Sequence, residues 1–241
     1  MRKKMKRHIY NLDSDELIDG YERFSGSVNK QGGWAGPAMY FHKKTLNYLN
    51  QRLNQNEEYQ NILSDNEFLE SLYATLATWG LHNMTGPFMI DFDPFKAKIE
   101  NLGTFLEDLR NYNLRNNWEN IEEKKEEIKD KFSEIRITTF ENTYLVANSK
   151  LFFHLNPNIF PIVDRRYILS YFYGNNYHPT GNAQKEVYWD IMEEYQKFLS
   201  RKYEVITNIK REFKVENWIP DLKIIDNIVI GLKLKQILET G

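Results

Sequence analysis

Asp164 is the residue whose setting in this sequence best suits chemistry. It lies three residues after Pro161, which cannot occupy a helix interior because it lacks an N–H group and its ring clashes with the preceding turn. Phe160, just before the proline, is pushed toward an extended conformation. A new helix therefore starts near Asp164, where a carboxylate can accept hydrogen bonds from the free N–H groups of the first turn. The carboxylate is either a helix cap or a site residue, and the local sequence leaves both open.

Several other kinds of site find no support in the sequence. It contains no cysteine, which excludes disulfides, thiolate metal sites and a cysteine nucleophile. Its five histidines show no H-E-x-x-H or H-x-x-H spacing, and we expect neither a metal site nor a cofactor. No G-x-S-x-G motif surrounds Ser149, so that serine carries no local sign of activation.

A glycine-rich segment, residues 25–37, is a further candidate. It lacks the Lys-Ser/Thr pair that closes a phosphate-binding Walker loop, and no apolar strand precedes it. Loops of this kind often carry function, and this one contains Trp34. One hypothesis is therefore a small-molecule or nucleotide pocket beneath Gly32 to Gly36, lined by Trp34 and His42.

The elements that would position these residues are helical. Apolar side chains recur at the spacing of an α-helix through most of the chain, whereas the alternation typical of strands is confined to Ile135–Thr138. Pro37 suits the first turn of a helix, and Asp65 is a predicted N-cap. The expected helices cover residues 14–24, 38–53, 67–81, 94–109, 118–132, 140–155, 164–173, 186–214 and 220–238.

These patterns predict an all-α protein, a compact multi-helix bundle. With 41% apolar and 15% aromatic residues, the chain is too hydrophobic to be disordered. Its 241 residues fit one helical domain, residues 1–241, and no linker forces a division. A two-lobed variant of this domain would place a cleft between residues 34–140 and residues 141–241.

Charge and hydropathy limit the partners. The net charge of −2 and the pI near 6.3 argue against an extensive nucleic-acid-binding surface but leave room for a local basic face. Residues Met1 to Arg7 include five basic side chains, which form either a loose solvated terminus or an arm that contacts phosphates. Since no stretch is long and apolar enough to span a membrane and no secretory signal is present, we expect a soluble, cytoplasmic protein with no membrane partner.

The centre of the chain has a distinctive order: an apolar helix, Ser149 and Lys150, a second apolar segment, then Pro161-x-x-Asp164 before a basic helix start. This order resembles the helix-hairpin-helix DNA glycosylase superfamily over about residues 140–172. It also looks like uncharacterised proteins that share this helical fold. The resemblance implies a helix-hairpin-helix-like centre that grips DNA, with Asp164 as the catalytic carboxylate that supports loss of a damaged base. For Lys150 it implies a backbone-contacting or nucleophilic amine.

The same resemblance implies that a base flipped out of the duplex is held by aromatic side chains. Trp34, Trp79 and Tyr173 lie in or beside predicted loops and could stack on such a base. Arg165 and Arg166 directly follow the aspartate. They either contribute to substrate binding, form an ion pair that holds the aspartate, or are ordinary surface charges.

The leading hypothesis is a DNA-acting base-excision protein similar to an N-glycosylase, with duplex DNA as its partner. The alternative is a non-enzymatic helix-hairpin-helix-like protein that binds nucleic acid or a protein partner and uses Asp164 only as a cap. The acidic pI favours the alternative. So does the absence of glycine from Leu145 to Lys150, because the family places glycines there whose backbone approaches a phosphate.

Overall fold

The computed structural model describes residues 3–30, 37–81, 88–140, 143–175 and 177–240. Within these ranges the protein is all-α, as predicted, and contains no strand. A single antiparallel bridge joins Met89 to Thr138, where the alternating sequence suggests a strand. No helix of the described ranges is both long enough and apolar enough to cross a membrane.

The elements follow one another along the chain as short and long helices. The α-helices are α1 (Ser14–Lys30), α2 (Pro37–Asn54), α3 (Tyr59–Ser64), α4 (Asn66–Leu76), α5 (Phe92–Glu100), α6 (Gly103–Asp108), α7 (Trp118–Glu123), α8 (Lys125–Glu134), α9 (Leu145–Leu155), α10 (Ser170–Tyr173), α11 (Ala183–Glu212) and α12 (Asp221–Thr240). A 3₁₀ turn, η1 (Ile9–Asn11), precedes α1, and two π-helical turns are η2 (Ala77–Leu81) and η3 (Arg165–Leu169).

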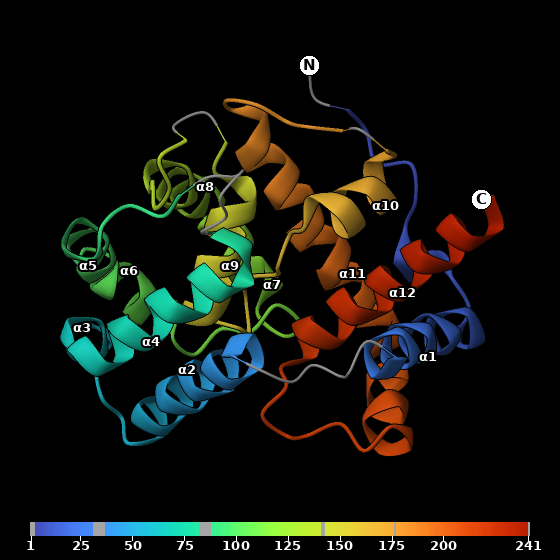
Figure 1. Ribbon diagram of the computed structural model, residues 1–241, viewed down its shortest axis with the longest axis horizontal. Helices are drawn as coiled ribbons and strands as arrows, with labels where there is room; N and C mark the ends of the chain where they lie inside the picture. The colour runs from blue at the N-terminus through green and yellow to red at the C-terminus, as the bar shows by residue number, and fades with distance from the viewer. Residues whose placement is uncertain (1–2, 31–36, 82–87, 141–142, 176, 241) are drawn as a thin grey trace.

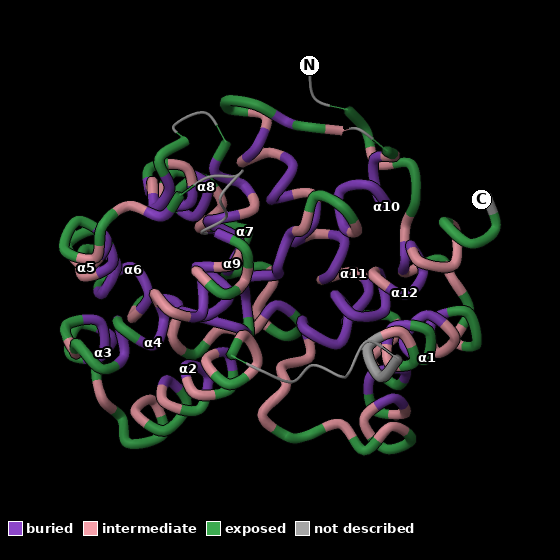
Figure 2. The backbone as a smooth tube through the Cα atoms, in the orientation of Figure 1, coloured by how far each residue is buried: buried purple, intermediate pink, exposed green. Residues whose placement is uncertain are grey.

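The helices form a compact body with α9 near its centre. In Figure 1, α1, α11 and α12 pack together on one side and α2 to α6 on the other. Helix α9 contacts α2 and α4 as well as α11, and most of its side chains are buried. The buried side chains form one continuous cluster from Ile9 to Leu232, seen as the buried stretches where helices face one another in Figure 2. The two-lobed variant of the single domain stays a prediction.

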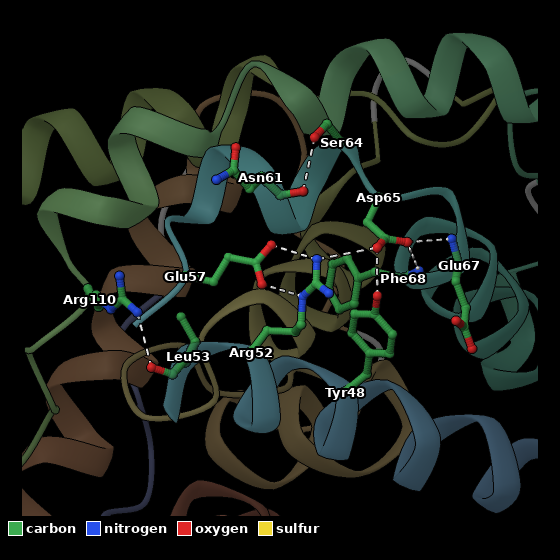
Figure 3. Close-up of polar contacts among 10 residues, drawn as sticks. All are labelled: Tyr48, Arg52, Leu53, Glu57, Asn61, Ser64, Asp65, Glu67, Phe68 and Arg110. Atoms are coloured by element: carbon green, nitrogen blue, oxygen red, sulfur yellow. Dashed lines mark hydrogen bonds and ion pairs between the residues drawn. The ribbon is translucent and has the colours of Figure 1, made fainter. Parts of the chain in front are cut away.

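Local signals place several helix starts as expected. Pro37 opens α2, and Asp65 caps α4 by accepting hydrogen bonds from the N–H groups of Glu67 and Phe68 at 2.8 and 3.3 Å. Tyr48 of α2 donates a hydrogen bond to the other oxygen of Asp65 at 2.7 Å (Figure 3). Partial burial alone would raise the pKa of Asp65, but these hydrogen bonds lower it below its ordinary value. The cap therefore also joins α4 to α2.

Other boundaries differ from the expectation. Helix α1 continues to Lys30, through residues predicted as loop. The helix expected over residues 94–109 is broken into α5 and α6, and a Cβ at Gly103 would lie only 2.2 Å from Gln60 Oε1 of α3. The predicted start of α9 was residue 140, whereas the helix begins at Leu145. Helix α3 was not predicted at all.

Helices α1 and α12 approach each other at two glycines. A Cβ added to Gly231 of α12 would lie 1.7 Å from the backbone oxygen of Gly20 in α1. A Cβ added to Gly20 would lie 3.0 Å from Leu232 Cγ. Backbone contact this close leaves no room for a side chain at Gly231, so the pairing of the first and last helices depends on that glycine.

We expect Gly231→Ala to lower the free energy of unfolding by about 2–3 kcal/mol, because the added methyl group forces the two helices apart. Urea denaturation followed by circular dichroism measures this change. Gly26→Ala is the matched control: it adds a methyl group to α1, where no atom apart from the chain neighbours and the backbone of the same helix lies within 4 Å. We expect that control to be neutral or to stabilise by up to about 1 kcal/mol. Equal stability of the two variants would contradict the packing argument.

Candidate functional site

A pocket with a volume of about 740 Å³ lies beside the start of α9. It is bounded by four stretches of chain that are distant in the sequence. Its residues are Trp79, Gly80 and Leu81 of η2; Phe140, Thr143, Leu145, Val146, Ala147 and Lys150 in and before α9; Asp164, Arg165 and Leu169 in and before η3; and His178, Pro179, Thr180 and Gln184. Asp164 and Lys150, the two predicted catalytic residues, thus line one pocket, together with Trp79 and Arg165.

Asp164 is held at the pocket by the segment that precedes it. Residues 160–163 are buried and belong to no helix, and Asp164 after them is extended, so the backbone groups of this segment need hydrogen-bond partners. The hydroxyl of Ser149 in α9 accepts a hydrogen bond from the N–H of Val163 at 2.9 Å and lies 3.2 Å from its carbonyl oxygen. Tyr188 of α11 donates to the carbonyl oxygen of Pro161 at 3.2 Å. These side chains anchor the segment to two helices.

The carboxylate of Asp164 is a cap and also lines the pocket. Its Oδ1 accepts a hydrogen bond from the N–H of Tyr167 at 2.8 Å, at the start of η3. Among the described residues, Oδ2 receives no hydrogen bond, and Asp164 forms no ion pair with Arg165 or Arg166. The two roles left open by the sequence are therefore compatible, because they use different oxygens.

Lys150 projects from α9 into the same pocket. Its ammonium group donates a hydrogen bond to the carbonyl oxygen of Trp79. That carbonyl belongs to a turn in which Gly80 adopts φ +85°, a left-handed conformation that favours glycine. Burial lowers the pKa of Lys150, although the negative charges of Asp164 and Asp226 act in the opposite direction. The amine is consequently easier to deprotonate than an exposed lysine.

Two buried histidines lie beneath Lys150. The Nδ1–H of His154 donates to the carbonyl oxygen of Lys150 at 2.7 Å, which leaves Nε2 of His154 as an acceptor. His42 of α2 lies with its Nδ1 2.8 Å from that Nε2 and must be the donor. The Trp79 ring packs on both imidazoles, with centroids 4.5 Å from His42 and 5.0 Å from His154. Burial lowers the pKa of His154 to about 4, and burial with repulsion from His154 lowers the pKa of His42.

A buried ion pair from α12 completes the surroundings of the pocket. Lys223 donates a hydrogen bond to Oδ2 of Asp226, and both side chains are almost wholly buried. The ammonium group of Lys223 lies 5.6 Å from the centre of the Trp79 ring. Burial raises the pKa of Asp226, while Lys223 and Lys150 act to lower it. The pocket therefore adjoins a cluster of alternating charges: Lys150, Asp164, Lys223 and Asp226.

The other predicted site residues are placed differently. Tyr173 is fully buried, with its ring stacked on Tyr177 at 4.7 Å, and does not line the pocket. Arg166 is exposed and lies over the ring of Tyr167, also outside the pocket. Trp34 lies outside the described residues. His42, predicted to line a pocket beneath Gly32 to Gly36, is buried against Trp79 and His154.

Sequence reasoning missed the contributions of distant residues. Gln184 of α11 accepts hydrogen bonds from the N–H groups of Tyr144 and Leu145, both at 2.9 Å, and so caps α9 from another helix. His178 lines the pocket from a loop whose glycine, proline and asparagine residues indicate only a turn. No group of three or more histidine, aspartate or glutamate side chains suited to a metal ion occurs in the described part of the chain.

Comparison with known proteins adds no relative. No protein-family model, no curated protein and no solved structure matches this chain. The chemistry of the pocket must therefore be argued from its own residues.

The histidine pair makes a testable contribution to stability. Because the folded pKa of His154 is about 4 and its ordinary value is 6.5, the unfolded chain binds more protons between these values. The free energy of unfolding therefore falls as the pH is lowered from about 7 to about 4, by about 3 kcal/mol from this residue. We expect His42→Gln/His154→Gln to lose that part of the pH dependence in urea denaturation at pH 7.5 and 4.5.

His178→Gln is the control for this measurement, because His178 is exposed. It should keep the pH dependence of the unmodified protein. A double variant with the same pH dependence as the unmodified protein would show that the buried pair does not titrate as described.

Proposed function

We propose that the pocket is the site of an N-glycosylase-like base excision from duplex DNA, with Asp164 as the catalytic carboxylate and Lys150 assisting. The observation that carries this proposal is that both side chains line one pocket with Trp79 and Arg165. Its volume of about 740 Å³ is within the range of about 300–1,000 Å³ typical of ligand pockets. The pocket can therefore hold a nucleobase with its sugar.

Each charged group has a role that suits this reaction. As the bond between the base and C1′ breaks, positive charge develops on the sugar, and the carboxylate of Asp164 would stabilise it or orient the attacking water. Its Oδ2 is the oxygen available for this purpose, since Oδ1 caps η3. The water oxygen then bonds to C1′, and the base leaves with the electrons of the broken bond and a proton.

Lys150 would act as an amine whose neutral form is favoured by burial, which lowers its pKa. The guanidinium of Arg165, which is exposed at the pocket, suits contact with a phosphate of the bound strand. In this proposal α9 and the η3–α10 segment, joined by residues 156–164, correspond to the helix-hairpin-helix-like centre. The partner is duplex DNA, and the site of action is the cytoplasm.

An excision assay tests the proposal on a panel of duplexes, each containing one deaminated, oxidised or alkylated base. We expect the unmodified protein to release one of these bases and Asp164→Asn to release it at least about 100-fold more slowly, the usual scale of a lost acid–base group. Asp65→Asn is the matched control, because Asp65 also caps a helix but lies outside the pocket. It should retain activity.

The outcomes separate capping from catalysis. Equal losses in Asp164→Asn and Asp65→Asn would point to weakened helix capping instead of a missing catalytic group. No release from any duplex by a normally folded protein would refute the excision reaction and favour the non-enzymatic alternative. If the neutral amine of Lys150 takes part, the excision rate should rise with pH at values below the ordinary pKa of lysine, because the pKa of Lys150 is lowered. The Lys150→Gln variant should not show this rise.

A further inference from the structure

Three cationic side chains surround the short segment of residues 171–175, which follows η3. The ammonium nitrogen of Lys6 lies 3.3 Å from the position that a Cβ on Gly174 would occupy. Arg7 donates a hydrogen bond to the carbonyl oxygen of Tyr171 at 3.3 Å. From α12, the ammonium group of Lys233 donates to Oδ1 of Asn175 at 2.9 Å. Residues far apart in the sequence thus bring three positive charges to one place.

The N-terminal segment that carries two of these charges is anchored. The N–H of Lys6 donates to the carbonyl oxygen of Phe172 at 2.7 Å. Two residues later, Nδ1 of His8 lies 2.8 Å from Oε2 of Glu194, and the N–H of Ile9 donates to Oε1 of the same carboxylate at 2.7 Å. Figure 1 shows the segment running past α10 on its way to α1. Lys6 and Arg7 are therefore held beside α10, not on a loose terminus.

None of the three cations has an acidic partner in the described part of the chain: no carboxylate lies within ion-pair distance of Lys6, Arg7 or Lys233. The neighbouring Lys235, by contrast, pairs with Asp19 at 3.1 Å. Two carboxylates are close enough to Tyr171 to raise its pKa, Glu16 and Glu194. Glu194 is already bound to His8 and Ile9, and Glu16 forms no ion pair with Arg7 in the described residues.

Without an acidic partner, the charged form of Lys233 is destabilised. Its side chain is only 7% exposed, and burial together with the positive charge of Arg7 lowers its pKa. A buried cation beside a second cation is unfavourable for folding unless an anion joins them.

We propose that Lys6, Arg7 and Lys233 bind an oxyanion, namely a phosphate group of the DNA backbone. The identification of DNA as the source of that phosphate rests on the proposed function. Lysine and arginine together are well suited to phosphate, which they bind through several charge-assisted hydrogen bonds. The N-terminal segment is then the phosphate-contacting arm that its composition allows.

The proposed anion site lies close to the pocket along the chain. Leu169 lines the pocket, and the next residue begins α10, which the arm contacts. His178, Pro179 and Thr180, which follow within a few residues in the sequence, also line the pocket. The anion site and the pocket therefore adjoin the same short stretch of chain, as expected if one strand presents a base to the pocket and a nearby phosphate to the arm.

The test measures binding of an undamaged fluorescent duplex by anisotropy between about 50 and 200 mM salt, where counterion release reports the number of phosphate contacts. Lys6→Gln/Arg7→Gln should weaken binding for every sequence and reduce the slope of log K against log salt by about 1. Lys98→Gln/Lys214→Gln is the control, since both lysines are exposed and lack an ion pair in the described residues. It should leave the slope nearly unchanged.

The outcomes are distinct from those of the excision assay. Equal slopes for the two double variants would overturn the anion site on DNA. Calorimetric titration of inorganic phosphate into the unmodified protein and the Lys6→Gln/Arg7→Gln variant distinguishes free phosphate from a phosphate of the DNA backbone as the bound anion. If phosphate binds saturably but the double substitution leaves the salt slope of DNA binding unchanged, the assignment of the site to the DNA backbone is overturned. A changed slope in a protein that excises no base would leave this inference standing and remove only the proposed reaction.

Discussion

The hydrogen bonds between Ser149 and Val163 are the contacts on which the candidate site depends most. Residues 160–163 are buried without being helical, so their N–H and C=O groups cannot bond to one another as they would in a helix. Removing the hydroxyl would leave the N–H of Val163 buried and unpaired, which costs about 1–3 kcal/mol. Because Lys150 follows Ser149 and Asp164 follows Val163, this contact also brings the two proposed catalytic groups to the same pocket.

The polar groups behind the pocket show how burial tunes its chemistry. His154, Lys150 and the Trp79 carbonyl form a continuous series of hydrogen bonds, which His42 extends to α2. Such groups cost stability when buried, and the cost appears as lowered pKa values of the histidines and of Lys150. Perturbed groups gathered around one pocket are a common property of functional sites. The same burial that costs stability thus favours the neutral form of the Lys150 amine.

The distribution of charge matters more here than its sum. A net charge of −2 suggests little affinity for nucleic acid, yet most carboxylates of the described residues are occupied by nearby cations or by helix starts. Around residues 171–175 the balance is reversed, because Lys6, Arg7 and Lys233 come together without an acidic partner. Only the folded arrangement of the N-terminal segment, α10 and α12 creates this local excess.

Local chemistry was sufficient to predict the all-α class, the start of α2 at Pro37 and the caps at Asp65 and Asp164, because each depends on neighbours within one or two turns. It also named Asp164 and Lys150 as candidate site residues; the two side chains line one pocket, and their catalytic roles stay a prediction. Helix boundaries that depend on packing were not predictable: the break between α5 and α6 lies at Gly103, where a Cβ would clash with Gln60 of α3.

The composition of the candidate site could not be predicted from the sequence either, because it depends on the packing of separate helices. His42, Trp79, Gln184 and Asp226 lie on separate helices, and no local pattern relates them to Lys150. From the sequence, Tyr173 lies beside a predicted loop and is expected to be accessible. In the fold its ring is buried and stacks on Tyr177. The sequence determined which segments are helical and where a carboxylate caps one of them. Only the packing of those helices decided which side chains share a pocket, since burial and long-range hydrogen bonds exist only after the chain has folded.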